Sequence, residues 1–149
     1  MKKCLLFLFL SPLISSIYKE PPEFNYSDST FAVGSMKYLP FLGVDCNDLS
    51  QSEQSKYYDS IVQFLNTHRN IYLELGYHSN ERGAYQYNKI WTMKLAQIYK
   101  NKIMVNLIDT LQFRTVGYGE SIPLVKNAKT EEEHYKNKRC ELIIIDIRK

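Results

Sequence analysis

Histidines, cysteines and paired carboxylates are the side chains of this sequence that could carry out chemistry. The three histidines are His68, His78 and His134, and none has the spacing to the cysteines that a metal site requires. Asp45 and Asp48 could form a carboxylate pair, but such residues commonly cap the helix that follows a loop. The sequence contains no serine elbow and no phosphate-binding glycine loop. We therefore expect a binding module rather than an enzyme, with no metal and no cofactor.

The charge of the chain argues against a nucleic-acid partner. The net charge of the 149 residues is +3, and Lys2 and Lys3 contribute two of these charges. Without them, 17 basic residues (19 less these two) face 16 acidic residues. Affinity for nucleic acid depends mainly on clustered Lys and Arg, so a nearly neutral domain lacks the main driving force.

The N-terminus has the order of a secretory signal. Lys2 and Lys3 precede the apolar run Cys4–Leu10, and Pro12 and small residues follow. The run is too short to span a bilayer comfortably. We expect a cleaved signal peptide over residues 1–16, with an uncleaved anchor as the alternative.

The remaining chain is predicted to be a linker followed by one domain. Residues 17–30 contain two adjacent prolines and several polar residues, which is typical of a linker. Residues 31–149 are enough to bury a hydrophobic core without further support. An exported protein meets an oxidising compartment, which would allow a disulfide between Cys46 and Cys140. A buried free thiol at Cys140 is the alternative.

Apolar periodicity predicts the elements of the first half of this domain. A strand is expected within Val33 to Val44, and the capping box Ser50-x-x-Glu53 opens a helix that ends near Thr67 or His68. The apolar face of this helix is formed by Tyr57, Tyr58, Ile61, Phe64 and Leu65.

A strand and a second helix are expected next. Ile71, Leu73 and Leu75 alternate with Tyr72 and Glu74, which predicts a strand with one packed face. We expect a loop from Gly76 through Gly83 and a helix over about Ala84 to Lys100. Its predicted packed stripe is Tyr87, Trp91, Leu95 and Ile98.

The last third is predicted to hold two strands and a short helix. Leu111 to Val116 is a plausible strand that ends in a turn at Gly117-Tyr118-Gly119. A second capping box, Thr130-x-x-Glu133, opens a helix to about Lys136. Cys140 to Ile147 should be a central strand with both faces covered, since four apolar residues follow one another in it. Strands that alternate with helices predict a sheet covered by helices.

Three segments, taken in order, resemble the OmpA-like domain family, the peptidoglycan-associating domains of bacterial envelopes. They are the run ELGYHSNERG at 74–83, the pair Tyr87-Asn88, and the run GYGESIP at 117–123 together with NKRCE at 137–141. The resemblance extends from about Val33 to the end. It implies an α+β fold, a β-α-β-α-β sandwich with helices packed on a mixed sheet. It also implies a periplasmic or outer-membrane-associated protein that holds peptidoglycan non-covalently.

The resemblance also implies a ligand site, from which this sequence departs. The family grips the stem peptide of peptidoglycan, typically at diaminopimelate, with a carboxylate for its ammonium group and a guanidinium for its carboxylate. The matching residues here are Asn80 and Leu95, so both charges are replaced. Losing two charged contacts could weaken binding by roughly a hundredfold or more. Arg82 and Arg139 could compensate if they face the same cleft.

The ligand contacts predicted from the resemblance come from His78, Ser79, Asn80, Asn88 and Arg139. Several of them have a structural alternative: His78 and Ser79 could order the loop, and Asn88 could be a packed helix residue. Two functions follow. The first is association with peptidoglycan with weakened or altered ligand choice. The second is an envelope protein–protein interaction module that has lost peptidoglycan binding. The oligomeric state does not follow from the sequence.

Overall fold

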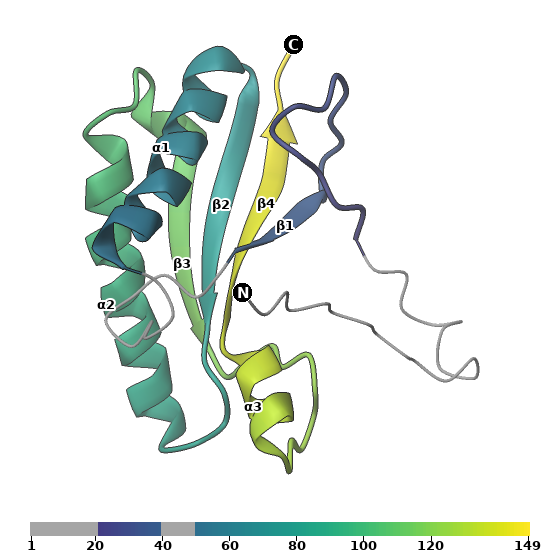
Figure 1. Ribbon diagram of the computed structural model, residues 1–149, viewed down its shortest axis with the longest axis vertical. Helices are drawn as coiled ribbons and strands as arrows, with labels where there is room; N and C mark the ends of the chain where they lie inside the picture. Colours follow the sequence, from purple (N-terminus) through teal and green to yellow (C-terminus); the bar gives the residue numbers. More distant parts are fainter. Residues whose placement is uncertain (1–20, 40–49) are drawn as a thin grey trace.

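The computed structural model describes residues 21–39 and 50–149 (Figure 1). The expected signal peptide, Asp45, Asp48 and Cys46 lie outside these residues. The elements in chain order are β1 (Met36–Leu39), α1 (Gln51–Thr67), β2 (Ile71–His78), α2 (Tyr85–Met104), a 3-10 turn (Thr110–Gln112), β3 (Phe113–Gly119), α3 (Glu131–Asn137) and β4 (Arg139–Ile147).

The four strands form a mixed sheet in the order β1-β4-β2-β3. β2 pairs with β3 in parallel, whereas β4 pairs antiparallel with both β1 and β2. β4 therefore lies inside the sheet, which confirms the prediction of a central last strand. The predicted α+β architecture, with helices packed on a mixed sheet, is also confirmed.

Helices α1 and α2 bury their apolar residues in one cluster on one face of this sheet. Tyr99 of α2 stacks between Tyr58 of α1 and Tyr77 of β2, with ring centroids 5.4 and 5.8 Å apart. β2 contributes alternate residues to this core, because successive side chains of a strand point to opposite faces. Both predicted capping boxes form, at Ser50–Glu53 and at Thr130–Glu133.

The prediction of a loop that begins at Gly76 was wrong, because β2 continues to His78. The strand is hydrogen-bonded to β4 on one side and to β3 on the other as far as His78. Its polar face is also buried, and the side chains of Glu74 and His78 are 3% and 1% exposed. Tyr118 covers this face, and a Cβ at Gly76 would lie 3.1 Å from its ring.

The predicted packed stripe of α2 was also wrong. Tyr87 and Ile98 are 65% and 47% exposed, and Trp91 is half-buried, so only Leu95 of the stripe lies in the core. Compared with the predicted stripe, the buried face is shifted by about one residue toward the C-terminus. It consists of Asn88, Thr92, Leu95, Ala96, Tyr99 and Ile103. Asn88 and Thr92 are polar side chains that bond to Glu120 and to the backbone of Gly119, respectively, and a pattern of apolar residues cannot detect such a face.

The third strand begins later and runs further than predicted. Gly117-Tyr118-Gly119 is its last part and not a turn. Gly117 is required by α2, since a Cβ there would lie 2.3 Å from the backbone nitrogen of Met93. The helix and the strand thus touch backbone to backbone, which only glycine allows.

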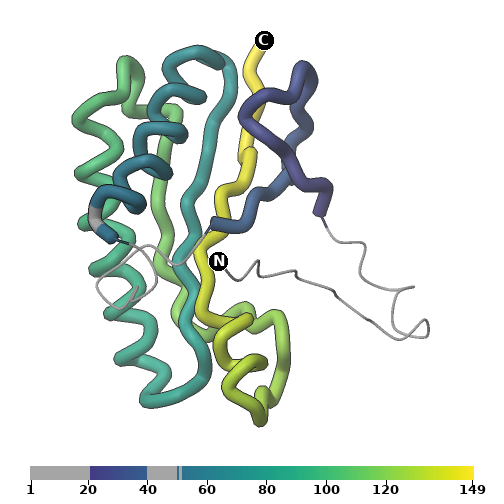
Figure 2. Tube along the Cα trace, in the orientation of Figure 1, coloured from purple at the N-terminus to yellow at the C-terminus, as the bar shows by residue number. Residues whose placement is uncertain are grey.

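Residues 21–30, which were expected within a linker, pack against the domain (Figure 2). Phe24 is 2% exposed and belongs to the core cluster, where it contacts Phe31 and Phe64. The backbone nitrogen of Met36 donates to the oxygen of Pro22. Phe24 explains why the segment packs against the domain, because burial of its ring in the hydrophobic cluster stabilises this arrangement.

Among the described residues, no helix combines the length and the apolar character needed to cross a membrane.

Candidate functional site

The predicted ligand residues are brought together at one end of the sheet, which is the lower end in Figure 1. β2 ends there at His78, α2 begins there at Tyr85, β3 ends at Gly119 and β4 begins at Arg139. The loop of residues 79–84 connects β2 to α2 and carries Ser79 and Asn80. The sequence motifs therefore meet in space because four elements begin or end at the same edge.

Asn88 closes the loop of residues 79–84. Its Nδ2 donates to the backbone oxygens of Asn80 and Arg82 at 3.1 and 3.2 Å, and also to the carboxylate of Glu120. A side-chain amide has two N–H donors, and these three acceptors occupy both, so no N–H of Asn88 is left for a ligand. Asn88 is 5% exposed. Its geometry favours the structural role that was its alternative at the sequence level.

Asn80 is the predicted ligand residue that remains accessible. It is half-buried, and its Oδ1 accepts from the backbone nitrogen of Arg82 at 3.2 Å. Its Nδ2 has no hydrogen-bond partner within the described part of the chain. An amide oriented in this way can donate to an anionic or carbonyl oxygen of a ligand, whereas the acid of the family pattern would accept from an ammonium group.

Two carboxylates near Asn80 were not among the predicted site residues. Glu120 is half-buried and accepts from Asn88, and Glu81 accepts from Asn137 Nδ2 at 3.2 Å. The pKa of Glu81 is held below its usual range by a hydrogen bond from the backbone N–H of Glu81 itself, and also by Asn137 and His134. Glu120 lies within the GYGESIP run, so the motif itself was the signal that could have identified it. Glu120 and Glu81 therefore supply negative charge near Asn80, which stands where the family pattern has an acid.

Ser79 is 5% exposed, and its backbone nitrogen donates to the oxygen of Gly119 at 2.9 Å. Its Oγ has no partner within the described residues. The hydroxyl is itself buried, so a ligand would have to displace neighbouring groups to reach it, while the backbone fixes the loop to β3.

His78 and Arg139 belong to a buried polar chain on the face of the sheet opposite α1 and α2. His78 Nε2 lies 3.2 Å from Glu141 Oε2, and its ring stacks on Tyr118 at 4.8 Å. Arg139 Nε donates to Glu141 Oε1 at 2.6 Å. Burial opposes ionisation of Glu141, but His78 and Arg139 outweigh it and hold its pKa below the usual range.

Neither arginine that could compensate for the lost charges is free. Arg139 is 7% exposed, and its two terminal nitrogens donate to the backbone oxygens of Asn137 and Ile122. Arg82 forms a bidentate pair with Glu131 of α3. Leu95, at the position of the family's arginine, is 3% exposed in the core. The site therefore presents amides and carboxylates but no unpaired guanidinium among these residues.

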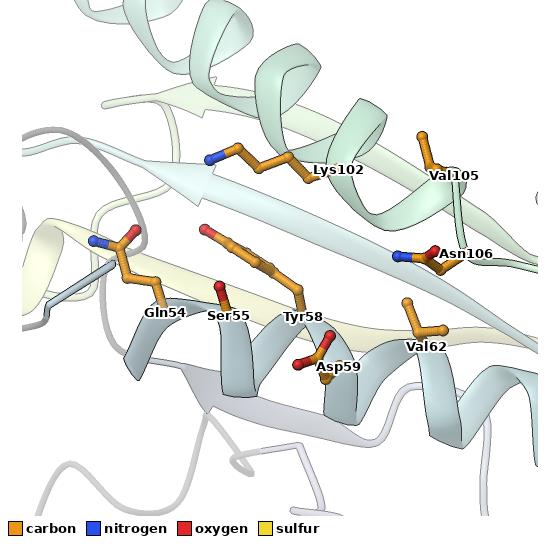
Figure 3. A pocket seen from close by; sticks show the side chains of 8 residues that line it. All are labelled: Gln54, Ser55, Tyr58, Asp59, Val62, Lys102, Val105 and Asn106. Atoms are coloured by element: carbon orange, nitrogen blue, oxygen red, sulfur yellow. The ribbon is translucent and has the colours of Figure 1, made fainter. Parts of the chain in front are cut away.

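Two surface hollows lie away from this loop. One, of about 350 Å³, lies between α1 and the end of α2, and Tyr58, Asp59 and Lys102 are among its lining residues (Figure 3). The other, of about 320 Å³, follows α2 and β3 and includes Lys89 and Thr115. No group of three or more metal-ligating side chains occurs in the described residues.

Comparison with known proteins finds relatives that are named peptidoglycan-associated lipoproteins. The chain is 30% identical to the peptidoglycan-associated lipoprotein of Buchnera aphidicola over 126 residues, which cover 80% of this chain and 70% of the relative. It is 29% identical to the peptidoglycan-associated lipoprotein of Legionella pneumophila, and the match covers 80% of this chain and 57% of the relative. No family model matches the chain.

A solved structure confirms the fold independently of sequence. The crystal structure of the peptidoglycan-associated lipoprotein from Burkholderia pseudomallei superposes with a TM-score of 0.56 at 20% identity. The superposition covers 72% of this chain and 87% of the other. At this identity the likeness establishes the shared architecture and not a shared ligand.

Proposed function

Because this chain belongs to the OmpA-like domain family, we propose that its domain associates non-covalently with peptidoglycan, with weakened or altered ligand choice. The observation that carries the proposal is the relative at 30% identity, which is named for its association with peptidoglycan. The loop of residues 79–84 supports it, since the Nδ2 of the half-buried Asn80 remains available there. We propose no catalytic role, and we place the domain in the periplasm or at the outer membrane.

The altered ligand choice follows from the charges around the loop. Asn80 and Leu95 occupy the positions of the family's acid and arginine, and Leu95 is buried. Glu120 and Glu81 leave the loop negative, while Arg82 and Arg139 are bound to their own carboxylates. An ammonium group of a ligand suits the carboxylates of this surface, and the Nδ2 of Asn80 suits a carbonyl or carboxylate oxygen of the same ligand, whereas no guanidinium of the predicted site is left to hold a carboxylate.

Co-sedimentation with insoluble peptidoglycan tests the proposal. The full chain should pellet with peptidoglycan above the baseline measured without it, and free diaminopimelate should compete. Asn80→Asp restores a charge and should raise the apparent affinity about fivefold, since a charged hydrogen bond exceeds a neutral one by about 1 kcal/mol. Asn80→Ala should lower retention. Asn101→Ala, at the other end of α2, is the matched control and should behave as wild type.

A second candidate function is an envelope protein–protein interaction module. It is favoured by Leu95 in the core and by the internal pairing of Arg139. Wild type and Asn80→Asp that both stay wholly in the supernatant, with unchanged thermal unfolding, would contradict wall association and support this alternative.

A further inference from the structure

The turn between α2 and β3 exposes three aliphatic side chains. Val105, Ile108 and Leu111 are 81%, 67% and 80% exposed, whereas Leu107 between them is 9% exposed and packs inward. We call residues 105–111 the apical turn. Single exposed aliphatic side chains are normal on a protein surface. Three of them within seven residues form an apolar patch, which indicates an interaction site.

The apical turn is held in place by hydrogen bonds to the end of α1. Asn66 Nδ2 donates to the oxygen of Asn106 at 3.1 Å, and the backbone nitrogen of Ile108 donates to Asn66 Oδ1 at 3.0 Å. Gln112 Nε2 donates to the oxygen of His68 at 2.9 Å. The backbone is therefore fixed with the three side chains outward, and their exposure is a property of the folded state.

The end of the molecule that carries the apical turn has a small excess of basic residues. The turn of residues 68–70 contacts Gln112, directly after the apical turn, through His68, and the end of β4 contacts the turn of residues 68–70, since the backbone nitrogen of Arg148 donates to the oxygen of Asn70. Asp109 accepts from the backbone nitrogen of Leu111 as a cap, and Asp146 pairs with Arg148. The basic residues at this end are Arg69, Lys102, Arg148 and Lys149, against the acids Asp59, Asp109 and Asp146.

This combination fits a lipid surface better than a protein groove. The apical turn lies at the upper end of the molecule (Figure 1), and a bilayer accepts exposed aliphatic side chains there without a matching pocket. Aliphatic side chains enter the acyl boundary, while neighbouring Lys and Arg attract anionic headgroups. Lys102 and Val105 line the same hollow (Figure 3), and the Nζ of Lys102 lies 5.9 Å from the centre of the Tyr58 ring.

The apical turn and the loop of residues 79–84 lie at opposite ends of α2 (Figure 2). The 20 residues of this helix separate them by roughly 30 Å, at about 1.5 Å a residue. A molecule bound at one end therefore leaves the other end free. We propose that the apical turn docks on an anionic phospholipid bilayer, a property that does not rest on peptidoglycan association.

Vesicle flotation with a matched pair of variants tests the docking. Ile108→Ser/Leu111→Ser removes two exposed aliphatics from the apical turn, and Ile122→Ser/Leu124→Ser removes two 51%-exposed aliphatics near the other end. With the full chain and vesicles of phosphatidylglycerol and phosphatidylcholine, we expect the first pair to weaken binding roughly tenfold or more. The second pair should bind as wild type. Arg69→Gln should weaken binding about fivefold, and only on anionic vesicles.

Tryptophan fluorescence locates the contact even if another segment also binds lipid. The chain has one tryptophan, so Trp91→Phe provides a background in which Ile108→Trp and Ile122→Trp are each the single probe. The probe at 108 should shift to the blue on anionic vesicles, and the probe at 122 should not.

An unshifted probe at 108, or equal flotation of the two double variants, would overturn the proposal. If the apical variant instead abolishes self-association in sedimentation velocity while lipid has no effect, the turn is a contact between copies of the chain and not a lipid site. Retention on peptidoglycan is measured separately, so either proposal can fail while the other holds.

Discussion

A single amide, that of Asn88, connects three parts of the candidate site. It joins the oxygens of Asn80 and Arg82 to the carboxylate of Glu120, and it is buried. In this position Asn88 shapes the loop of residues 79–84. Asn80 and Ser79 are different, because each keeps a polar group that the described structure does not use.

Asn88→Ala should lower the free energy of unfolding by about 1–3 kcal/mol, because it leaves buried acceptors without a donor. Urea unfolding at pH 7 measures this. Asn101→Ala, an exposed position on the same helix, should change the free energy by less than about 0.5 kcal/mol. Equal small effects for both variants would contradict the structural role of Asn88.

Glu141 should make stability depend on pH. Its pKa is lowered in the folded state from the ordinary value of 4.5, so its stabilising contribution is complete above that value. The contribution is lost as the pH falls through the lower, folded-state pKa. Glu141→Gln should therefore be less stable than wild type near neutral pH, and the difference should shrink from about pH 5 downwards.

Unfolding free energies measured across that pH range test the prediction for Glu141. Glu132→Gln is the control, because Glu132 pairs with Lys136 on the surface with its side chain 79% exposed. The control should follow the wild-type profile. A gap between wild type and Glu141→Gln that stays constant down to pH 3 would show that the carboxylate charge is not responsible.

At the scale of elements, α2 and β3 are joined by small and polar residues. Thr92 Oγ1 accepts from the backbone nitrogen of Gly119 at 2.9 Å and donates to the oxygen of Asn88. Lys89 Nζ donates to the oxygen of Gly117 at 2.8 Å. This contact places Asn88 and Glu120 side by side, so the candidate site depends on how closely the helix approaches the strand.

Gly117→Ala should be severely destabilising, at about 3 kcal/mol or more, because the added methyl group would meet the backbone of Met93. Gly34→Ala is a useful comparison. Gly34 has a φ of +87° but open space around it, so only the backbone strain of about 1–2 kcal/mol is expected. Denaturant unfolding of both variants measures the difference. A milder effect at Gly117 than at Gly34 would mean that α2 can move away from β3.

At the scale of the whole molecule, the packed unit includes the segment before β1. Phe24, Tyr26 and Phe31 contact Phe64 of α1, which gives this segment an aromatic anchor. The two ends of the molecule are formed by different elements: the loop of residues 79–84 and α3 lie at one end, and the apical turn lies at the other (Figure 1). The domain can therefore offer separate surfaces to separate partners.

Phe24→Ala should cost about 3–5 kcal/mol, as expected for a buried aromatic side chain. Val33→Ala, at a 59%-exposed position in the same segment, should cost less than about 0.5 kcal/mol. Thermal and urea unfolding test both. If Phe24→Ala unfolds like wild type, residues 21–30 are a linker after all.

The sequence by itself determined the order of helices and strands, both capping boxes and the family motifs. Each of these depends on neighbours within a few residues, as the bond between Ser50 and Glu53 shows. Only the tertiary structure decided the buried face of α2, the length of β2 and the pairing of Arg139 with Glu141. Those features depend on partners that are distant in the chain or on other elements, and a polar side chain is buried only where such a partner satisfies it.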